Sequence, residues 1–210
     1  MKEIRYRFYP NTSSASLRKI KLIDKFLYFF KGNGNKTPDK TAIKEITIVQ
    51  LAHIGDMILM LPAIKALNSI SNYKINLLVS SQNYTIASKL NFVDNVVVAD
   101  APYFSRGKKV SYLKFIRQLM KVKTGLIYDV RGDLRNNFFI KFFVRKKLFA
   151  GYDVGGGGAL LDVVFPFTHG GHVTNLFEPL FNYLGYPGID ITKYWKEDDL
   201  PYEEITGQTF

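Results

Sequence analysis

The sequence predicts an α/β fold, a Rossmann-like parallel sheet with helices on both faces. From residue 45 onward, short β-branched runs alternate with segments whose apolar residues recur at helical spacing. Strands that alternate with helices imply right-handed βαβ units, and hence a parallel sheet covered on both sides. The 210 residues, of which 47% are hydrophobic, can supply the core that such a sheet needs.

The elements can be assigned in chain order. Strands are expected at 46–51, 74–80, 95–99, 126–130 and 147–151, and helices at 56–70, 83–90, 134–144 and 173–184. Pro62 should kink the first of these helices or mark a restart. A further helix after the basic loop 105–109 should present one apolar face formed by Val110, Leu113, Ile116 and Met120.

Residues 1–44 form a basic N-terminal extension. Residues 18–31 are amphipathic and rich in Lys, Leu and Phe, and a breaker-rich linker follows at 32–38. One interpretation is an in-plane membrane anchor, whose apolar side chains enter the bilayer while its cations meet lipid phosphates. The other is a helix packed on the domain surface with solvated lysines. The high net charge fits both.

The charge balance favours phosphate-bearing partners. Lys and Arg total 29 against 18 acidic residues, which gives a formal charge of +11. Nucleic acid would fit the charge, but no nucleic-acid-binding motif is present, and we expect no such partner. The absence of cysteine excludes disulfides and thiolate metal sites. No apolar run is long enough to span a bilayer and no signal peptide is evident, so we expect a cytoplasmic chain, peripheral to the membrane at most.

The turn at 52–56 is the first candidate for chemistry, because ligands of open parallel sheets bind beyond the carboxyl ends of the strands. Gly55 would let the backbone turn tightly and approach a ligand. Asp56 would open the helix, either as a simple N-cap or as a functional carboxylate where the helix dipole favours an anion. The run Gly155–Gly158 could cradle a phosphate, but a mobile loop is the favoured interpretation, since the Lys-Ser/Thr of a P-loop is missing.

Three segments resemble glycosyltransferase family 9, the lipopolysaccharide heptosyltransferases. "ITIVQLAHIGDMILMLPAIKAL" at 46–67 is similar to the family's opening strand, Gly-Asp turn and Leu-Pro-Ala helix. "GLIYDVRGDLR" at 125–135 resembles its strand that ends in Asp before a glycine-containing turn. "HVTNLFEPLFNYLG" at 172–185 resembles, more weakly, its His-led helix. The segments occur in the family's order.

The resemblance implies an inverting sugar transfer without metal or cofactor. Family members have two Rossmann-like domains in the GT-B arrangement, with the acceptor on the N-terminal one and the nucleotide-sugar donor, such as ADP-heptose, on the other. The role of general base falls on Asp56. Acceptor contacts are expected from the turns and loops beyond the strands. The alternative for Asp129 is that it holds its own loop by hydrogen bonds. The alternative for each cation is that it is a solvated surface charge. The expected contact residues are His53, Gly55, Lys108, Asp129, Arg131, Arg135 and His172.

The expected domains are the extension at 1–44, an acceptor-binding domain at 45–187 and the start of an interdomain link at 188–210. No donor domain follows in the sequence, which suggests a fragment, a broken gene or a stand-alone domain that needs a partner. We therefore expect a glycosyltransferase half that is inactive alone. The alternative is a non-catalytic module that binds anionic glycolipid or a membrane surface. The sugar, the acceptor and the oligomeric state do not follow from the sequence.

Overall fold

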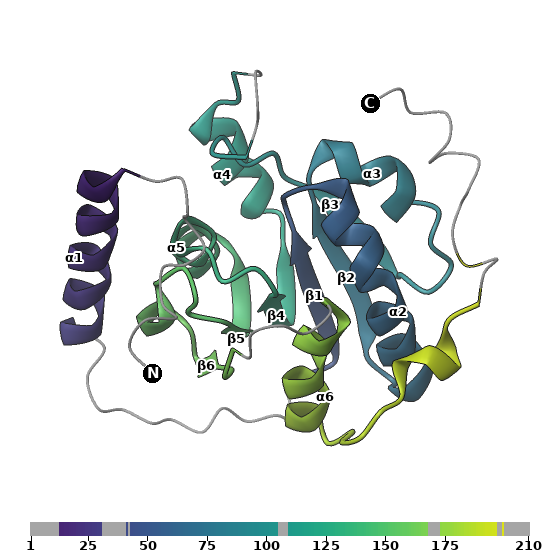
Figure 1. The fold of residues 1–210 in the computed structure, drawn as a ribbon. Helices are drawn as coiled ribbons and strands as arrows, with labels where there is room; N and C mark the ends of the chain where they lie inside the picture. The colour runs from purple at the N-terminus through teal and green to yellow at the C-terminus, as the bar shows by residue number, and fades with distance from the viewer. Residues whose placement is uncertain are drawn as a thin grey trace.

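A computed structural model of the chain describes residues 13–30, 41, 43–104, 109–167, 173–196 and 199. Its centre is a six-stranded, all-parallel sheet with the order β3-β2-β1-β4-β5-β6 (Figure 1). The two halves of the sheet diverge from β1 and β4, which are neighbours although two strands separate them in the sequence. The strands are β1 (Glu45–Gln50), β2 (Lys74–Val79), β3 (Asn95–Val98), β4 (Lys123–Asp129), β5 (Arg145–Gly151) and β6 (Val163–Val164).

Helices cover both faces of the sheet, as the sequence predicts. One apolar cluster joins the sheet to α2 (Ile54–Ile70), α3 (Ser81–Ala87) and α6 (Glu178–Leu184), and the 3-10 helix η3 (Val173–Phe177) leads into α6. A second cluster joins the other face to α4 (Tyr112–Leu119) and α5 (Leu134–Phe143). The predicted α/β class, with a Rossmann-like parallel sheet, is therefore confirmed.

The structure also corrects details of the predicted elements. Pro62 lies inside α2, which runs as one helix without a restart. The expected apolar face of α4 is wrong, because Leu113 and Met120 are each 56% exposed while Phe115 and Leu119 are buried. The two-residue strand β6 is too short to leave a pattern in the sequence.

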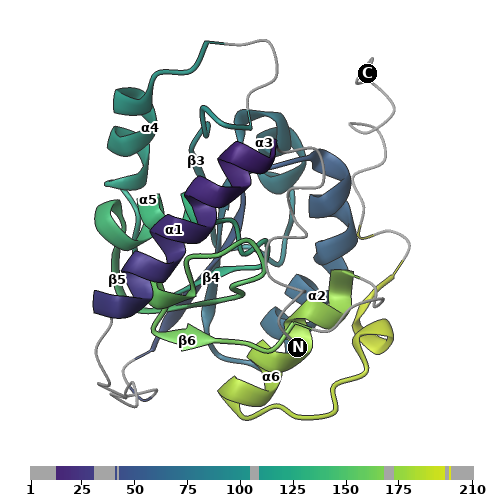
Figure 2. The ribbon, with the colours of Figure 1, turned by 60° about the vertical axis from the view of Figure 1, so that its left-hand side comes forward.

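The described part of the N-terminal extension forms the helix α1 (Ser14–Phe30), which packs on the domain at the segment between β5 and β6 (Figure 2). Its buried Asp24 accepts a hydrogen bond from the Gly157 backbone N–H at 2.7 Å. The Tyr28 hydroxyl donates to Asp153 at 3.2 Å. The Gly155–Gly158 loop, for which mobility was the favoured interpretation, is buried in the structure and continues into the 3-10 turn η2 (Gly158–Leu160).

The segment after α6 packs back onto the domain. Its 3-10 helix η4 (Ile191–Tyr194) contacts α2, and Lys65 of α2 forms an ion pair with Asp199. The expected role of residues 188–210 as the start of an interdomain link stays a prediction, and residues 200–210 lie outside the described residues.

Candidate functional site

The turn after β1 differs in detail from the prediction. His53, not Asp56, occupies the N-cap position of α2, and its carbonyl accepts the Met57 N–H at 3.3 Å. Asp56 is the third residue of the helix, so its carboxylate lies in the first turn and does not cap it. The interpretation of Asp56 as a simple N-cap is therefore wrong. A carboxylate in this position is stabilised by the helix dipole while its oxygens stay available to other groups.

Two side chains that sequence reasoning missed hold this turn. The Gln50 side-chain oxygen accepts the Ala52 backbone N–H at 3.2 Å. The buried Asn83 amide, from α3, donates to the carbonyls of Gln50 and Ala52, each at 3.2 Å. Two buried side-chain amides that form hydrogen bonds with the backbone groups of a turn fix the course of that turn. Only the neighbouring positions of β1 and β2 bring Asn83 there, which no local pattern could reveal.

Of the two roles predicted for Gly55, a tight turn and close approach to a ligand, the structure contradicts the first. Gly55 is the second residue of α2, and a Cβ built there would meet no atom within 4 Å. A tight turn does not need glycine at this position, so that reason is wrong. The open space beside Gly55 leaves the backbone of the helix N-terminus accessible to a ligand.

The turn after β4 is held by two buried carboxylates. Asp129 accepts the Arg131 N–H at 3.1 Å, and Asp133 caps α5 by accepting the Arg135 N–H at 2.8 Å. Gly132 between them has φ +66°, and a Cβ there would lie 2.7 Å from the Tyr152 carbonyl oxygen, so only glycine fits. Burial raises the pKa of Asp129 to about 7, against the opposing hydrogen bond from Arg131.

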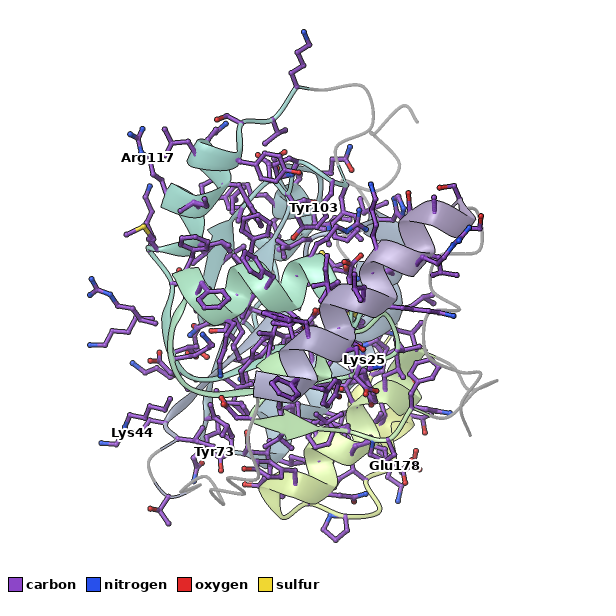
Figure 3. All side chains as sticks on the ribbon, turned by 90° about the vertical axis from the view of Figure 1, so that its left-hand side faces the viewer. Lys25, Lys44, Tyr73, Tyr103, Arg117 and Glu178 are labelled. Atoms are coloured by element: carbon purple, nitrogen blue, oxygen red, sulfur yellow. The ribbon has the colours of Figure 1, made fainter. Side chains whose placement is uncertain are left out.

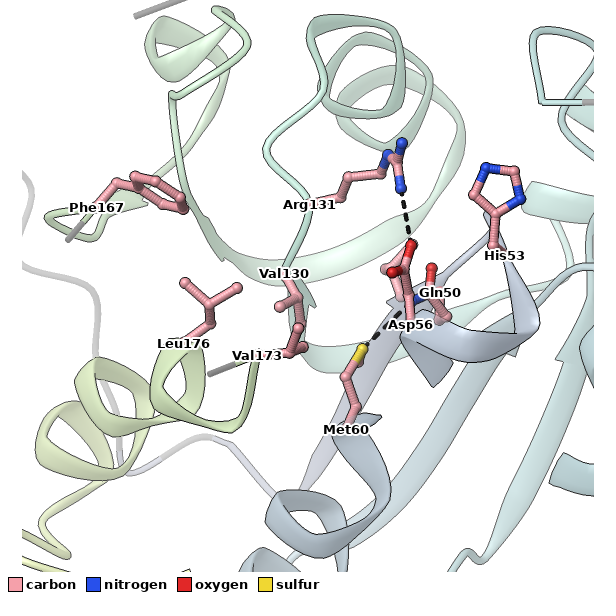
Figure 4. A pocket seen from close by; sticks show the side chains of 10 residues that line it. Gln50, His53, Asp56, Met60, Val130, Arg131, Phe167, Val173 and Leu176 are labelled. Carbon is pink, nitrogen blue, oxygen red and sulfur yellow. Dashed lines mark hydrogen bonds and ion pairs between the residues drawn. The ribbon is translucent and has the colours of Figure 1, made fainter. Parts of the chain in front are cut away.

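Arg131 joins the two turns. Its guanidinium donates to the Asp56 carboxylate at 3.2 Å (Figure 4). The same guanidinium lies over the Phe104 ring, 4.8 Å from its centroid. The two side chains are partly exposed, at 24% for Arg131 and 40% for Asp56. The pair is possible because β1 and β4 are adjacent, so that their C-terminal turns meet at one edge of the sheet.

A hollow of about 340 Å³ opens beside this ion pair. Figure 4 shows a polar side formed by His53, Asp56 and Arg131 and an apolar side that includes Phe167 and Leu176. A hollow with convergent polar groups and an apolar wall is the usual form of a small-molecule site. Its lining comes from all three segments that carry the resemblance. The lining residues are Val49, Gln50, His53, Asp56, Met60, Val130, Arg131, Phe167, Val173 and Leu176.

A second hollow, of about 390 Å³, lies beyond the ends of β1, β2 and β3. His53 lines both hollows, which places its ring between them. Phe104 and Lys109 also line the second hollow, while residues 105–108 of the basic loop lie outside the described residues. Ser81 and Asp100 complete its polar wall, and no sequence signal singled them out.

The remaining predicted residues are distributed as follows. Arg135 is engaged with Asp133, to which its Nε donates at 3.0 Å, and its guanidinium lies 4.7 Å from the Tyr103 ring centroid. Asp129 is fully buried and does not line either hollow. Acceptor contacts by these two residues stay predictions. Lys108 and His172 lie outside the described residues.

Comparison with solved structures identifies the architecture. The E. coli heptosyltransferase WaaC, solved with ADP, matches with a TM-score of 0.55 at 19% identity, over 70% of this chain and 49% of that one. The same enzyme with ADP-2-deoxy-2-fluoro heptose gives a TM-score of 0.56 at 17% identity, over 71% of this chain and 53% of that one. A family 9 glycosyltransferase from Veillonella parvula gives a TM-score of 0.57 at 15% identity, over 74% of this chain and 44% of that one.

This chain has a heptosyltransferase-like fold. At these identities the likeness concerns the fold, and the chain spans about half the length of the structures it matches. No protein-family model and no curated protein matches the sequence. The predicted heptosyltransferase-like fold is thus confirmed by the comparison of structures.

Proposed function

We propose that this chain is the acceptor-side part of a metal-independent, inverting glycosyltransferase. The sugar, by default heptose, would pass from a nucleotide-sugar to a lipopolysaccharide or another surface glycan. One observation supports this most. The three segments that resemble the family, far apart in the sequence, meet around Asp56 at the ligand edge of a heptosyltransferase-like fold.

Asp56 is the proposed general base. An acceptor hydroxyl in the hollow would attack the anomeric carbon, and the bond from that carbon to the nucleotide phosphate would break on the opposite side. Asp56 would take the hydroxyl proton as the new bond forms. The departing phosphate would carry away the electron pair of the bond that breaks. The carboxylate is partly exposed and held by Arg131, which gives it a defined orientation within reach of a bound hydroxyl.

Arg131 is the proposed receptor for an anionic group of the acceptor. Its ion pair with Asp56 is partly exposed, and pairs of this kind contribute about 1 kcal/mol or less. A phosphate or carboxylate on the acceptor can therefore draw the guanidinium away at small cost. The Phe104 ring beneath the guanidinium would continue to stabilise its charge during that exchange. His53 and Lys109 extend the polar surface toward the second hollow.

The donor would bind to a second domain outside these 210 residues. The E. coli heptosyltransferase WaaC, one of the proteins that this chain resembles, was solved with ADP and with ADP-2-deoxy-2-fluoro heptose, and this chain spans about half its length. We therefore propose a nucleotide-sugar such as ADP-heptose as the co-substrate and expect no transfer by the chain alone. Among the described residues, no helix is both long and apolar enough to cross a bilayer. We separately propose that the chain acts in the cytoplasm, at the inner face of the membrane that would carry the acceptor.

The test separates acceptor binding from transfer. Calorimetry would measure binding of a phosphorylated lipopolysaccharide precursor to the chain. Mass spectrometry would measure transfer after a donor-binding domain is supplied as a second chain. Asp56→Asn should bind acceptor within about threefold of the wild type and lose transfer by about 1,000-fold. Glu178→Gln, an exposed carboxylate on α6, serves as the matched control and should leave both unchanged. Transfer by Asp56→Asn at a wild-type rate would remove Asp56 from its role.

A binding module without catalysis is the second candidate. The chain would then hold an anionic glycolipid through Arg131 and the two hollows but take no part in chemistry. Acceptor binding that is lost in Arg131→Gln, combined with no transfer from any supplied donor domain, would favour this function. Transfer restored by a donor domain would exclude it.

A further inference from the structure

The helices α1, α4 and α5 form one side of the molecule with an unusual surface composition. α4 packs against α5, and α1 and α5 both contact the turn η2. Figure 3 looks onto this side, with α1, α5 and α4 toward the viewer. Most of the large apolar side chains that are exposed in the described residues lie on or next to these three helices. They are Leu22, Ile23, Phe26, Phe29, Tyr112, Leu113, Met120, Phe138 and Phe142.

The helix α1 packs on the domain through one face and exposes large apolar side chains on another. Asp24 and Tyr28 point toward the domain, where they bond to Gly157 and Asp153. Leu22, Phe26 and Phe29, spaced four and three residues apart, share the opposite face and are 70%, 62% and 81% exposed. A helix that served only as a surface cover would carry polar residues there.

Aromatic contacts continue this apolar surface across α4 and α5. Tyr112 stacks on Phe139 with ring centroids 5.8 Å apart, and Phe139 contacts Phe138, which contacts Phe142 at 4.9 Å. Tyr112 and Phe142 remain 54% and 60% exposed. These rings are held in place by one another, so that they can enter an apolar medium without reordering.

The charges on this side are almost all positive. The sequences of the three helices contain one acidic residue, Asp24, which is buried and bonded to Gly157. Their basic residues are Arg18, Lys19, Lys21, Lys25, Lys114, Arg117, Arg135 and Lys141. Arg135 and Lys141 form ion pairs with Asp133 and Asp162, and Lys21 also has an interaction partner. Exposed cations thus surround the exposed rings, with no exposed carboxylate in the three helices.

From these observations we propose that the α1/α4/α5 face docks in the plane of an anionic membrane surface. The exposed rings and Leu22 would enter the boundary between headgroups and acyl chains, and the cations would contact lipid phosphates. Charge complementarity selects this partner, because an acidic bilayer matches both the cations and the apolar surface. The face lies outside the candidate site and its lipid binding needs no sugar transfer, so this proposal and the proposed function can fail separately.

Vesicle flotation with the 210-residue chain tests the proposal. Vesicles of phosphatidylcholine alone are compared with vesicles that also contain phosphatidylglycerol, at low and high salt. The wild type should bind the anionic vesicles and lose most of that binding at high salt, where charges are screened. Equal binding to both vesicle types, or none to either, would overturn the proposal. Concentration-dependent self-association without vesicle binding would assign the face to a second copy instead.

Variants on two separate helices locate the contact. Phe26→Ser/Phe29→Ser on α1 and Phe138→Ser/Phe142→Ser on α5 should each weaken vesicle binding by at least about tenfold. Arg18→Gln/Lys25→Gln should weaken it by about 30-fold, since each cation near the surface contributes about fivefold. Tyr84→Ser on α3, also an exposed aromatic, and Lys44→Gln/Lys193→Gln are the matched controls and should bind as the wild type does.

Circular dichroism melting of every variant checks that the fold is kept, which the exposure of these positions favours. Wild-type binding by both folded aromatic variants would overturn the proposal. Loss of binding in the controls to the same extent would do so too, because binding would then follow overall charge or apolarity and not this face.

Discussion

Asp129 should make the stability of the chain depend on pH in a direction unusual for an aspartate. Its carboxyl is completely buried at the end of β4, and burial raises its pKa from 3.8 to about 7. Between pH 4 and 7 the native chain therefore holds a proton that the unfolded chain has released. Stability falls as pH rises through this window and levels off above pH 7. The difference of about three pKa units corresponds to at most about 4 kcal/mol.

The substitution Asp129→Asn isolates this effect. The amide stays neutral at every pH, and its oxygen can still accept the Arg131 N–H that Asp129 accepts at 3.1 Å. Urea unfolding should be followed by circular dichroism at intervals from pH 4 to pH 8.5 for both proteins. The difference between them cancels the titration of the other groups. Relative to the wild type, the variant should gain up to about 4 kcal/mol of unfolding free energy between pH 4 and pH 8.

Two results would refute this reasoning. A constant difference between Asp129→Asn and the wild type across the whole range would mean that Asp129 does not change its charge on burial. A difference that grows toward low pH would mean that the ionised carboxylate is the form that the fold stabilises. Glu178→Gln, which removes an exposed carboxylate, is the control for the loss of a negative charge, and its unfolding free energy should stay close to that of the wild type.

Three further substitutions test the site and its supports. Gly55→Ala should raise the unfolding free energy by up to about 1 kcal/mol, because the added Cβ meets no atom. The same substitution should weaken acceptor binding in calorimetry. Unchanged binding would mean that no ligand approaches this backbone. Asn83→Ala should lower the unfolding free energy by about 1–3 kcal/mol in urea titrations, whereas the exposed Asn91→Ala should have little effect. Asp24→Ala should accelerate hydrogen exchange at the Gly157 amide, and exchange as slow as in the wild type would show that α1 does not protect it.

Much of the fold follows from local patterns in the sequence. The run at 46–51 and the apolar positions of 56–70 identify a buried strand and its helix, because each pattern reports which faces are covered. The same reasoning failed for α4, where Leu113 and Met120 have the right spacing but Phe115 and Leu119 are buried. A helix with apolar residues on both faces does not reveal from its sequence which face meets the core.

The candidate site could be predicted in its position but not in its contacts. The resemblance selected Asp56 and Arg131 separately, and their ion pair depends on β4 lying next to β1, which strand order alone determines. Asn83 is similar, since its two hydrogen bonds cross from α3 to the turn after β1. Long-range pairs of this kind leave no periodic signal, because each partner is an ordinary polar residue in its own segment.

The site and the proposed membrane face are connected through Tyr103 and Phe104. The Phe104 ring lies under Arg131 and contacts Tyr103, which stacks on Phe139 with ring centroids 6.0 Å apart. Phe139 then contacts Phe138 at the start of the exposed rings. An acceptor whose lipid part stays in the bilayer would thus find Arg131 a few ring contacts from the membrane surface. Because Phe138→Ser/Phe142→Ser leaves Phe139 and Phe104 unchanged, that variant should lose vesicle binding while a water-soluble acceptor fragment still binds at Arg131.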